Sequence, residues 1–427
     1  MNPLKKNLVD WKTASLAFVG ACAGLQGAGT GSQGAAQKPD IFVIFTDEWS
    51  PRDTSWNNPM IKTPHLDAIA QEGMRFNSAY TPSPVCMAAR TCLLTGQYPH
   101  NTGLWGNSTD YAPMRRQATL FADLKAAGYT TAQIGKLHWT GGSRWQKEFG
   151  AESLEAFYRS LSIDHPEDIP SPNAGINDRG AFREFANRSG QLEAYSKDIA
   201  WRLKNEPFMP KASALSAAEH NEAFVTQRAL DFLEAQPADK PLFLVVSWFG
   251  PHPPLDAPEP YASMYDPEKI APPPNVKFPY LYFNKQITKD YWQRAKANYF
   301  GKMTYIDDQV ARVVAALKKR GNWDNTLVIF VSDHGEMLGA HGFMGKVHMH
   351  EESAGIPMFV RPPKGVKVAA KETNVPVSLL DVYATAVEAA GGTMTTQRVS
   401  RSLLPIVTGQ DKGEKQRPVF SEIYYKK

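Results

Sequence analysis

The sequence predicts an α/β fold in which a mostly parallel central sheet is covered by helices on both faces. Three short apolar, β-branched runs predict strands buried on both sides, at residues 40–45, 242–246 and 327–331. Helical patterns separate these runs, and strands that alternate with helices are typical of parallel sheets. The fold class depends on these two observations.

The remaining elements follow from local signals along the chain. Thr63 followed by Pro64 predicts the start of a helix that closes near Gly73. Periodicity and capping residues predict further elements, namely helices at 119–127, 219–233, 293–319 and 377–390, a strand at 130–134, and a Pro-rich surface loop at 253–284. Residues 141–217 are polar, aromatic and irregular, and we expect them to form an insertion on the substrate side.

The bulk composition is that of a large globular enzyme domain. The chain has 427 residues, of which 42% are hydrophobic and 21% are charged. Its net charge of +4 is small against 47 Lys and Arg and 43 Asp and Glu. The charge therefore gives no reason to expect a nucleic acid or an anionic membrane surface as partner.

Residues 1–38 are expected to be an export leader, which leaves residues 39–427 as the catalytic domain. Two lysines at positions 5 and 6 precede an apolar run at 14–25 that is too short to span a bilayer. Residues 19–22 resemble a lipobox, in which Cys22 would carry a lipid anchor. An ordinary cleaved signal peptide is the alternative. In both cases the protein is exported, as a periplasmic, secreted or envelope-anchored protein.

Cys86 and Cys92 are the cysteines that remain after the leader. Both lie in a stretch that is expected to be helical, where residues six apart point about 120° away from each other. A disulfide between them is therefore not expected. Prolines before Cys86 place it near a helix N-terminus, where the helix dipole lowers the pKa of a thiol. The alternative is a buried cysteine with a packing role only.

Polar side chains follow each of the three buried strands. Asp47 and Glu48 follow the first, His252 follows the second, and Asp333 and His334 follow the third. The carboxyl ends of parallel strands share one edge, so these side chains can meet there. Oxygen ligands with an imidazole suit Ca²⁺, Mg²⁺ or Mn²⁺. The alternative is that the aspartates cap the helices that follow.

A second group of side chains is cationic. Period two places Lys136 and His138 on one face, directly after the strand at 130–134. Lys346 follows a glycine-rich run at residues 339–345. If they converge with His252, they form a site for a compact tetrahedral oxyanion. The alternative for each lysine is a solvated surface charge.

The segment around Cys86 resembles the signature of the type I sulfatases, Cys-x-(Pro/Ala)-x-Arg followed by Thr-Gly. This signature directs the oxidation of its cysteine to formylglycine. Cys86, Ala88, Arg90, Thr95 and Gly96 match, although proline is usual where Ala88 stands. Further blocks resemble the family in the family's order, at residues 63–67, 135–138, 251–254, 306–310 and 333–339. The resemblance covers residues 39–410 apart from the insertion.

The resemblance implies an alkaline phosphatase-like fold and a metal-dependent sulfuric ester hydrolase. The chain stops where the small C-terminal subdomain usual in the family would begin, so either this subdomain is expected to be reduced or absent or the sequence is truncated. The implied metal ligands are Asp47, Asp333, His334, the modified Cys86, and Glu48 in a position where Asp or Gln is usual. Ca²⁺ is the expected cation, with Mg²⁺ and Mn²⁺ as alternatives. Arylsulfatases commonly have an Asp-Asn pair at this position. The Asp333-His334 pair resembles instead the pair in the branch that includes choline sulfatases and phosphonate monoesterases.

The resemblance also implies a role for each remaining site residue. A hydroxyl of hydrated formylglycine attacks sulfur while Lys136, Lys346 and the cation neutralise the sulfuryl oxygens. His252 and Lys346 lie near the leaving oxygen and can protonate it. His138 deprotonates the second hydroxyl, which expels sulfate. Arg90 is expected to orient the diol.

The implied partners are a sulfated small molecule or carbohydrate and a formylglycine-generating maturation enzyme. Six aromatic residues of the insertion are candidates for the substrate pocket or for packing, namely Trp145, Phe149, Phe157, Tyr158, Phe182 and Tyr195. Three other functions stay open. These are a phosphonate or phosphate ester hydrolase on the same scaffold, a catalytically silent binding protein with unmodified Cys86, and an enzyme that uses the Cys86 thiol directly.

Overall fold

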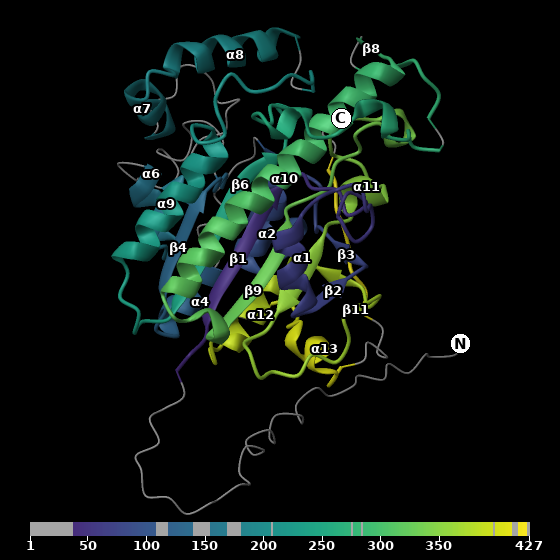
Figure 1. The fold of residues 1–427 in the computed structure, drawn as a ribbon. Helices are drawn as coiled ribbons and strands as arrows, with labels where there is room; N and C mark the ends of the chain where they lie inside the picture. Colours follow the sequence, from purple (N-terminus) through teal and green to yellow (C-terminus); the bar gives the residue numbers. More distant parts are fainter. Residues whose placement is uncertain are drawn as a thin grey trace, which may run out of the picture. The chain divides into compact units, whose positions relative to one another are not determined.

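A twisted eight-stranded sheet forms the centre of the part of the chain that the computed structural model describes (Figure 1). The described residues are 37–107, 118–139, 154–168, 181–205, 208–274, 276–282, 285–395, 398–411 and 417–424. From one edge to the other the strands are β11 (Glu372–Thr373), β2 (Met74–Phe76), β10 (Met358–Arg361), β9 (Thr326–Ser332), β1 (Asp40–Asp47), β6 (Leu242–Pro251), β4 (Thr130–Gly135) and β5 (His165–Asp168).

The four strands β9, β1, β6 and β4 are parallel neighbours, and this arrangement positions the site. In register, Val43 of β1 lies opposite Val245 of β6 and Ile329 of β9. β10 is the antiparallel exception, paired with both β9 and β2. The three buried apolar runs of the sequence are therefore adjacent central strands, as predicted.

Helices cover both faces of the sheet, because alternate side chains of β1 enter two different cores. Phe42 and Ile44 pack with α1 (Pro64–Gln71), α9 (Asn221–Ala235) and α10 (Lys289–Lys319). Ile41, Val43 and Phe45 pack with α2 (Cys86–Thr95), α4 (Leu120–Ala126), α12 (Asp381–Ala389) and α13 (Leu404–Thr408). Figure 1 shows α9 and α10 crossing one face of the sheet. This confirms the predicted fold class.

Smaller elements complete the described part. Two-stranded sheets are formed by β3 (Ala79–Tyr80) with β12 (Val377–Ser378), and by β7 (Tyr280–Tyr282) with β8 (Lys285–Ile287). Two short helices are α3 (Pro99–Thr102) and α11 (Glu351–Ala354). The cysteines Cys86 and Cys92 are both free, as expected from their helical spacing.

The insertion at 141–217 is more regular than its sequence predicts. Its described parts contain α6 (Leu154–Ser160), α7 (Ala181–Arg188) and α8 (Leu192–Asn205), and its strand β5 extends the central sheet beside β4. No period extends over the whole segment, although α7 by itself is amphipathic, with Phe182, Phe185 and Ala186 on one face. Tyr158 packs edge-on against Trp139, and Phe182 packs against Phe224, so both have packing roles. Tyr195 packs against Phe182 at the edge of the core.

Three local predictions need correction. The helix expected at 377–390 begins only at Asp381, because residues 377–378 pair with β3 as a strand. The loop at 253–284 is partly buried, since Leu255 and Ala257 are inaccessible and β7 lies within it. Thr63 precedes α1, but its side chain makes no capping hydrogen bond. The helix is capped instead by Asp307, whose carboxylate accepts hydrogen bonds from the backbone N–H groups of His65 and Leu66.

The expected leader, Cys22, Trp145 and Phe149 lie outside the described residues, and the side chain of Phe157 is likewise not described. Among the described helices, none is long and apolar enough to cross a membrane.

Candidate active site

The carboxyl ends of the parallel strands meet at one edge of the sheet, and backbone hydrogen bonds extend that meeting beyond the strands. The N–H of Asp333 donates to the carbonyl of Thr46 at 3.2 Å, and the N–H of His252 donates to the carbonyl of Asp47 at 3.1 Å. The N–H of Lys136 donates to the carbonyl of Ser247 at 2.8 Å. The residues that follow four strands are therefore held side by side, as the sequence predicts.

Cys86 lies at the centre of this edge. It is the first residue of α2 and is buried. Its Sγ lies 2.9 Å from Nζ of Lys346, 3.2 Å from Nε2 of His334 and 4.0 Å from Oδ1 of Asp47. Burial alone raises the pKa of the Cys86 thiol, but Lys136, Lys346 and His334 outweigh it and hold that pKa well below its usual range. The position is thus built to hold a negatively charged or strongly polar group.

Arg90 connects the carboxylates of two strands. One helical turn after Cys86, its Nη2 lies 2.9 Å from Oδ2 of Asp47 and its Nε lies 2.8 Å from Oδ2 of Asp333. Its Nη1 also donates to the carbonyl of Lys136 at 2.7 Å and to Oγ of Ser247 at 2.9 Å. Arg90 is predicted to orient the diol at position 86, and its hydrogen bonds fix the acidic side chains around that position. Its guanidinium fork suits several acceptors at once.

Glu48 adopts a backbone conformation that few non-glycine residues adopt, with φ at 64°. Tyr299 of α10 holds this turn, since its hydroxyl donates to the carbonyl of Glu48 at 2.7 Å and accepts from the N–H of Ser50 at 3.0 Å. The turn directs the Glu48 carboxylate to Nζ of Lys346 at 3.0 Å and Nε2 of His252 at 3.1 Å. Glu48 thereby joins the predicted metal residues to the predicted cationic residues.

Lys136 and His138 both reach the site, although for a different reason from the one predicted. Their strand ends at Gly135, and His138 has φ at 52°, so the period-two argument does not apply to them. Nζ of Lys136 forms an ion pair with Oδ2 of Asp47. His138 acts on the pKa of Cys86 through a side-chain hydrogen bond, and its Nδ1 is a buried atom without a partner.

The acidic side chains of this edge fit a divalent cation. Single donor atoms of Asp47, Cys86, Asp333 and His334 lie within 4.8 Å of one another, and the same holds for Asp47, Glu48 and His252. Burial and the crowding of like charges raise the pKa of Asp333 to about 6, and burial raises the pKa of Glu48 to about 7. The raised pKa values mean that the ionised form of these carboxyl groups is disfavoured, and a hard cation beside them would stabilise it. The oxygen-rich donor set matches Ca²⁺, Mg²⁺ or Mn²⁺.

One side of the site is open to solvent. The side chains of Asp47, Arg90, Asp333 and His334 are fully buried, whereas that of Lys346 is 15% exposed and that of His252 is 20% exposed. Lys346 and His252 therefore lie on the open side of the site. Two aromatic rings lie next to Gly345, the residue before Lys346: a Cβ on Gly345 would lie 3.4 Å from the Tyr282 hydroxyl and 3.8 Å from the Phe208 ring.

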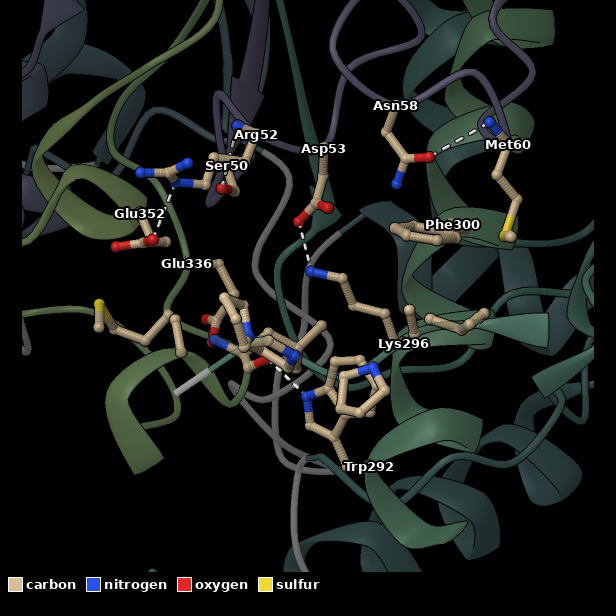
Figure 2. Close-up of a pocket in the computed structure, with 18 of the residues that line it drawn as sticks. Ser50, Arg52, Asp53, Asn58, Met60, Trp292, Lys296, Phe300, Glu336 and Glu352 are labelled. Atoms are coloured by element: carbon tan, nitrogen blue, oxygen red, sulfur yellow. Dashed lines mark hydrogen bonds and ion pairs between the residues drawn. The ribbon is translucent and has the colours of Figure 1, made fainter. Parts of the chain in front are cut away.

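A cavity of about 500 Å³ lies beside the site and is lined in part by Glu336 and Trp292 (Figure 2). Two ion pairs line it, Asp53 with Lys296 at 2.5 Å and Arg52 with Glu352 at 2.8 Å, as Figure 2 shows. Oε1 of Glu336 accepts from the N–H groups of Leu338 and Gly345 at 2.7 and 2.6 Å. Glu336 thus fixes the glycine-rich run that carries Lys346.

Three residues that support the site were not predicted from the sequence. Tyr299 and Lys302 lie in α10, and their polar ends reach backbone carbonyl groups of the loops at the site. Glu336 anchors the run before Lys346. The sequence signal that could have identified one of them is Lys302, a charged residue between Tyr299 and Ile306 on a mostly apolar helix face. A third possible ligand group, His65 with Asp307 and Asp308, lies at the start of α1, where Asp307 caps the helix.

Comparisons with known proteins agree with this geometry. A family model described as Sulfatase matches residues 39–392, a range that contains every predicted site residue. An arylsulfatase from Clostridium perfringens is 29% identical over 361 residues, which cover 76% of this chain and 69% of that protein. An ulvan-active sulfatase from Formosa agariphila is 29% identical over 353 residues, with 81% and 60% covered.

The likeness extends to solved structures. A phosphonate monoester hydrolase from Silicibacter pomeroyi superimposes with a TM-score of 0.75 at 24% identity, over 91% of this chain and 80% of that chain. At this identity the likeness shows a shared fold.

Proposed function

This chain belongs to the sulfatase family and is a sulfuric ester hydrolase, and on that premise we propose that it cleaves sulfate esters of carbohydrates through a formylglycine made from Cys86. One observation carries the proposal. The cysteine of the Cys-x-Ala-x-Arg motif is the first residue of α2, and Lys346, His334 and Asp47 surround its Sγ. In this reading Sγ stands in for the hydroxyl oxygens of the hydrated aldehyde.

Two groups beyond the standard side chains complete the proposed site. One divalent cation, Ca²⁺ with Mg²⁺ and Mn²⁺ as alternatives, would be held by Asp47, Glu48, Asp333, His334 and residue 86, and would supply Lewis-acid polarisation. Formylglycine would supply, as its hydrate, one hydroxyl that attacks sulfur and a second whose deprotonation releases sulfate and restores the aldehyde. A maturation enzyme that oxidises Cys86 is therefore a required partner.

The chain's own residues have separable roles in this proposal. Lys136 and Lys346 neutralise the sulfuryl oxygens, because their ammonium groups lie among the side chains that surround Cys86, where the sulfuryl group would bind. His252, on the open side, protonates the leaving oxygen together with Lys346. His138, whose side chain hydrogen-bonds to Cys86, accepts the proton of the second hydroxyl. Arg90 keeps Asp47 and Asp333 at a fixed separation.

A carbohydrate substrate is supported by the relatives and by the open side of the site. One relative is an ulvan-active sulfatase. Tyr282 and Phe208 pack edge to face, with ring centroids 6.1 Å apart, beside the residue that precedes Lys346. Aromatic side chains offer an apolar body with a polar tip, which suits a sugar ring and its hydroxyl groups. An export leader would bring the enzyme to extracellular polysaccharides.

The second candidate is a phosphonate or phosphate ester hydrolase, which the Asp333-His334 pair and the structural neighbour favour. The test is turnover of 4-nitrophenyl sulfate against 4-nitrophenyl phenylphosphonate by protein produced with a maturation enzyme. We expect kcat/KM to be at least tenfold higher for the sulfate. A preference for the phosphonate would assign the second function, and a C86A variant separates both from contaminating activity. Desulfation of ulvan oligosaccharides then tests the carbohydrate class.

A further inference from the structure

The buried ammonium group of Lys302 lies against the loop that carries His252. Lys302 is in the middle of α10, and its side chain is 1% exposed. Its Nζ donates to the carbonyl of His252 at 3.0 Å and to the carbonyl of Pro254 at 3.0 Å, and pairs with Oδ1 of Asp256 at 2.8 Å. All three hydrogen-bond donors of the ammonium are thus used on one five-residue stretch of chain.

We propose that Lys302 is a positioning residue that holds His252 in place for protonation of the leaving oxygen. Desolvating an ammonium group is costly, so such a group is stabilised only by close and well-oriented acceptors. The acceptors in this case are the backbone at His252 itself and at Pro254, two residues further on. A shift of the loop would break these bonds, which ties the position of the imidazole to that of α10. The inference rests on the proposed function.

The surroundings of Lys302 make this clamp stiff. On the other side of the loop, Oδ2 of Asp256 lies 3.5 Å from Nε2 of His220 at the start of α9. The preceding strand end also packs tightly, because a Cβ on Gly250 would lie 2.6 Å from Cδ1 of Ile306 and 3.1 Å from Cε of Lys302. The loop therefore has little room to move toward α10.

A second buried cation braces the loop from the insertion. Arg202 of α8 is fully buried, and its Nη1 donates to the carbonyl of Leu255 at 3.1 Å. Its Nε pairs with Asp198 at 3.0 Å. Lys302 and Arg202 thus approach the same stretch from two helices. Of the two, Lys302 contacts the backbone of His252 directly, so it is the residue to change.

The first arm of the test measures the clamp without reference to activity. Hydrogen–deuterium exchange of the peptide covering residues 249–257 is compared between wild type, K302M and K296M. Lys296 is the matched control, because it lies in the same helix and forms a shielded ion pair with Asp53, away from His252. We expect exchange to rise at least fivefold in K302M and to stay unchanged in K296M. Unchanged exchange in K302M would overturn the proposal.

The second arm tests the catalytic consequence. Phenyl sulfate has a poorer leaving group than 4-nitrophenyl sulfate and depends more on protonation. In K302M we expect kcat to fall about 10- to 100-fold on phenyl sulfate and less than threefold on 4-nitrophenyl sulfate, since a misplaced acid costs this much. KM should change little. The double variant K302M/H252A should be no slower than H252A, whereas losses that multiply would show that Lys302 does not act through His252.

A third variant separates rate from stability. K302M alone leaves Asp256 buried with one partner fewer, and that can unfold the protein. K302M/D256N removes both charges, and we expect it to recover thermal stability but not the rate on phenyl sulfate. Recovery of both would reduce Lys302 to a structural role and overturn the proposal. A wild type that turns over neither aryl sulfate would reject the proposed function, while the exchange experiment still decides the clamp.

Discussion

Nε of Arg90 lies 2.8 Å from Oδ2 of Asp333, and both side chains are fully buried. The same guanidinium group reaches Asp47 at 2.9 Å. A helix residue therefore fixes the spacing of two carboxylates that come from neighbouring strands. This arrangement holds the acidic side chains of the site at a fixed spacing.

The first prediction concerns that pair. Arg90→Met leaves two buried carboxylates without their cation, and breaking a buried pair in this way costs about 3–5 kcal/mol. The free energy of unfolding in urea should fall by this amount. Arg75→Met is the control, because Arg75 pairs with Glu372 at the surface, where a pair is worth about 1 kcal/mol or less. Similar losses in the two variants would contradict the account of Arg90.

The second prediction concerns Lys346. Its ammonium group lies 2.9 Å from Sγ of Cys86, where charge develops during sulfuryl transfer in the proposed mechanism. Removing one preorganised donor of this kind costs about 10²- to 10³-fold in kcat. Lys346→Met should show this loss with 4-nitrophenyl sulfate. The exposed Lys269, which pairs with Asp266, supplies the control, and Lys269→Met should keep wild-type kcat. A Lys346→Met enzyme within threefold of wild type would exclude the assigned role.

The third prediction concerns the cation. Dialysis against EDTA should abolish turnover, and added Ca²⁺ should restore it. A ligand at 100 times its dissociation constant stabilises the native state by about 2.7 kcal/mol, so Ca²⁺ should also raise the melting temperature.

Asp333→Asn should lose this thermal response. Asp308→Asn should keep it, because Asp308 belongs to the separate acidic group at the start of α1. If the Asp308 variant lost the response instead, the cation would bind at the acidic group at the start of α1 and not at the candidate active site.

The fourth prediction concerns pH and Asp256. Burial raises the pKa of this carboxyl, but Lys302 and His220 outweigh it and hold the pKa well below its usual range. A carboxyl with a lowered folded-state pKa stabilises the protein fully above the unfolded value of about 3.9, and this stabilisation is lost as pH falls toward the folded value. The stability difference between wild type and Asp256→Asn should be constant above about pH 5 and shrink below pH 4. A difference that grows with acidification would contradict the pairing.

The sequence was sufficient to predict the central fold and the meeting of the site residues. Continuous apolar runs such as residues 40–45 are specific for strands buried on both sides, and polar residues after parallel strands must share an edge. Asp47, His252 and Asp333 therefore came together as predicted. The resemblance to the sulfatase family came from the motif around Cys86, because periodicity alone predicts a fold class and not a family.

Other features depend on contacts that no local pattern encodes. The partners of Arg90 come from two strands, and its role as a bridge is visible only in three dimensions. Lys302 and Tyr299 act through backbone carbonyl groups of distant loops, which carry no sequence signature. The helices of the insertion were missed because no period extends over the whole segment, although the stripe of Phe182, Phe185 and Ala186 in α7 was a local signal for a helix.

The mass of the tryptic peptide Phe76–Arg90 tests the central claim most directly, because it contains Cys86 and no other cysteine. Conversion of cysteine to formylglycine lowers the peptide mass by about 18 Da. In active protein produced with a maturation enzyme we predict the lighter peptide, in proportion to the specific activity of each preparation. Full activity in protein whose peptide carries unmodified Cys86 would contradict the claim that formylglycine is the nucleophile.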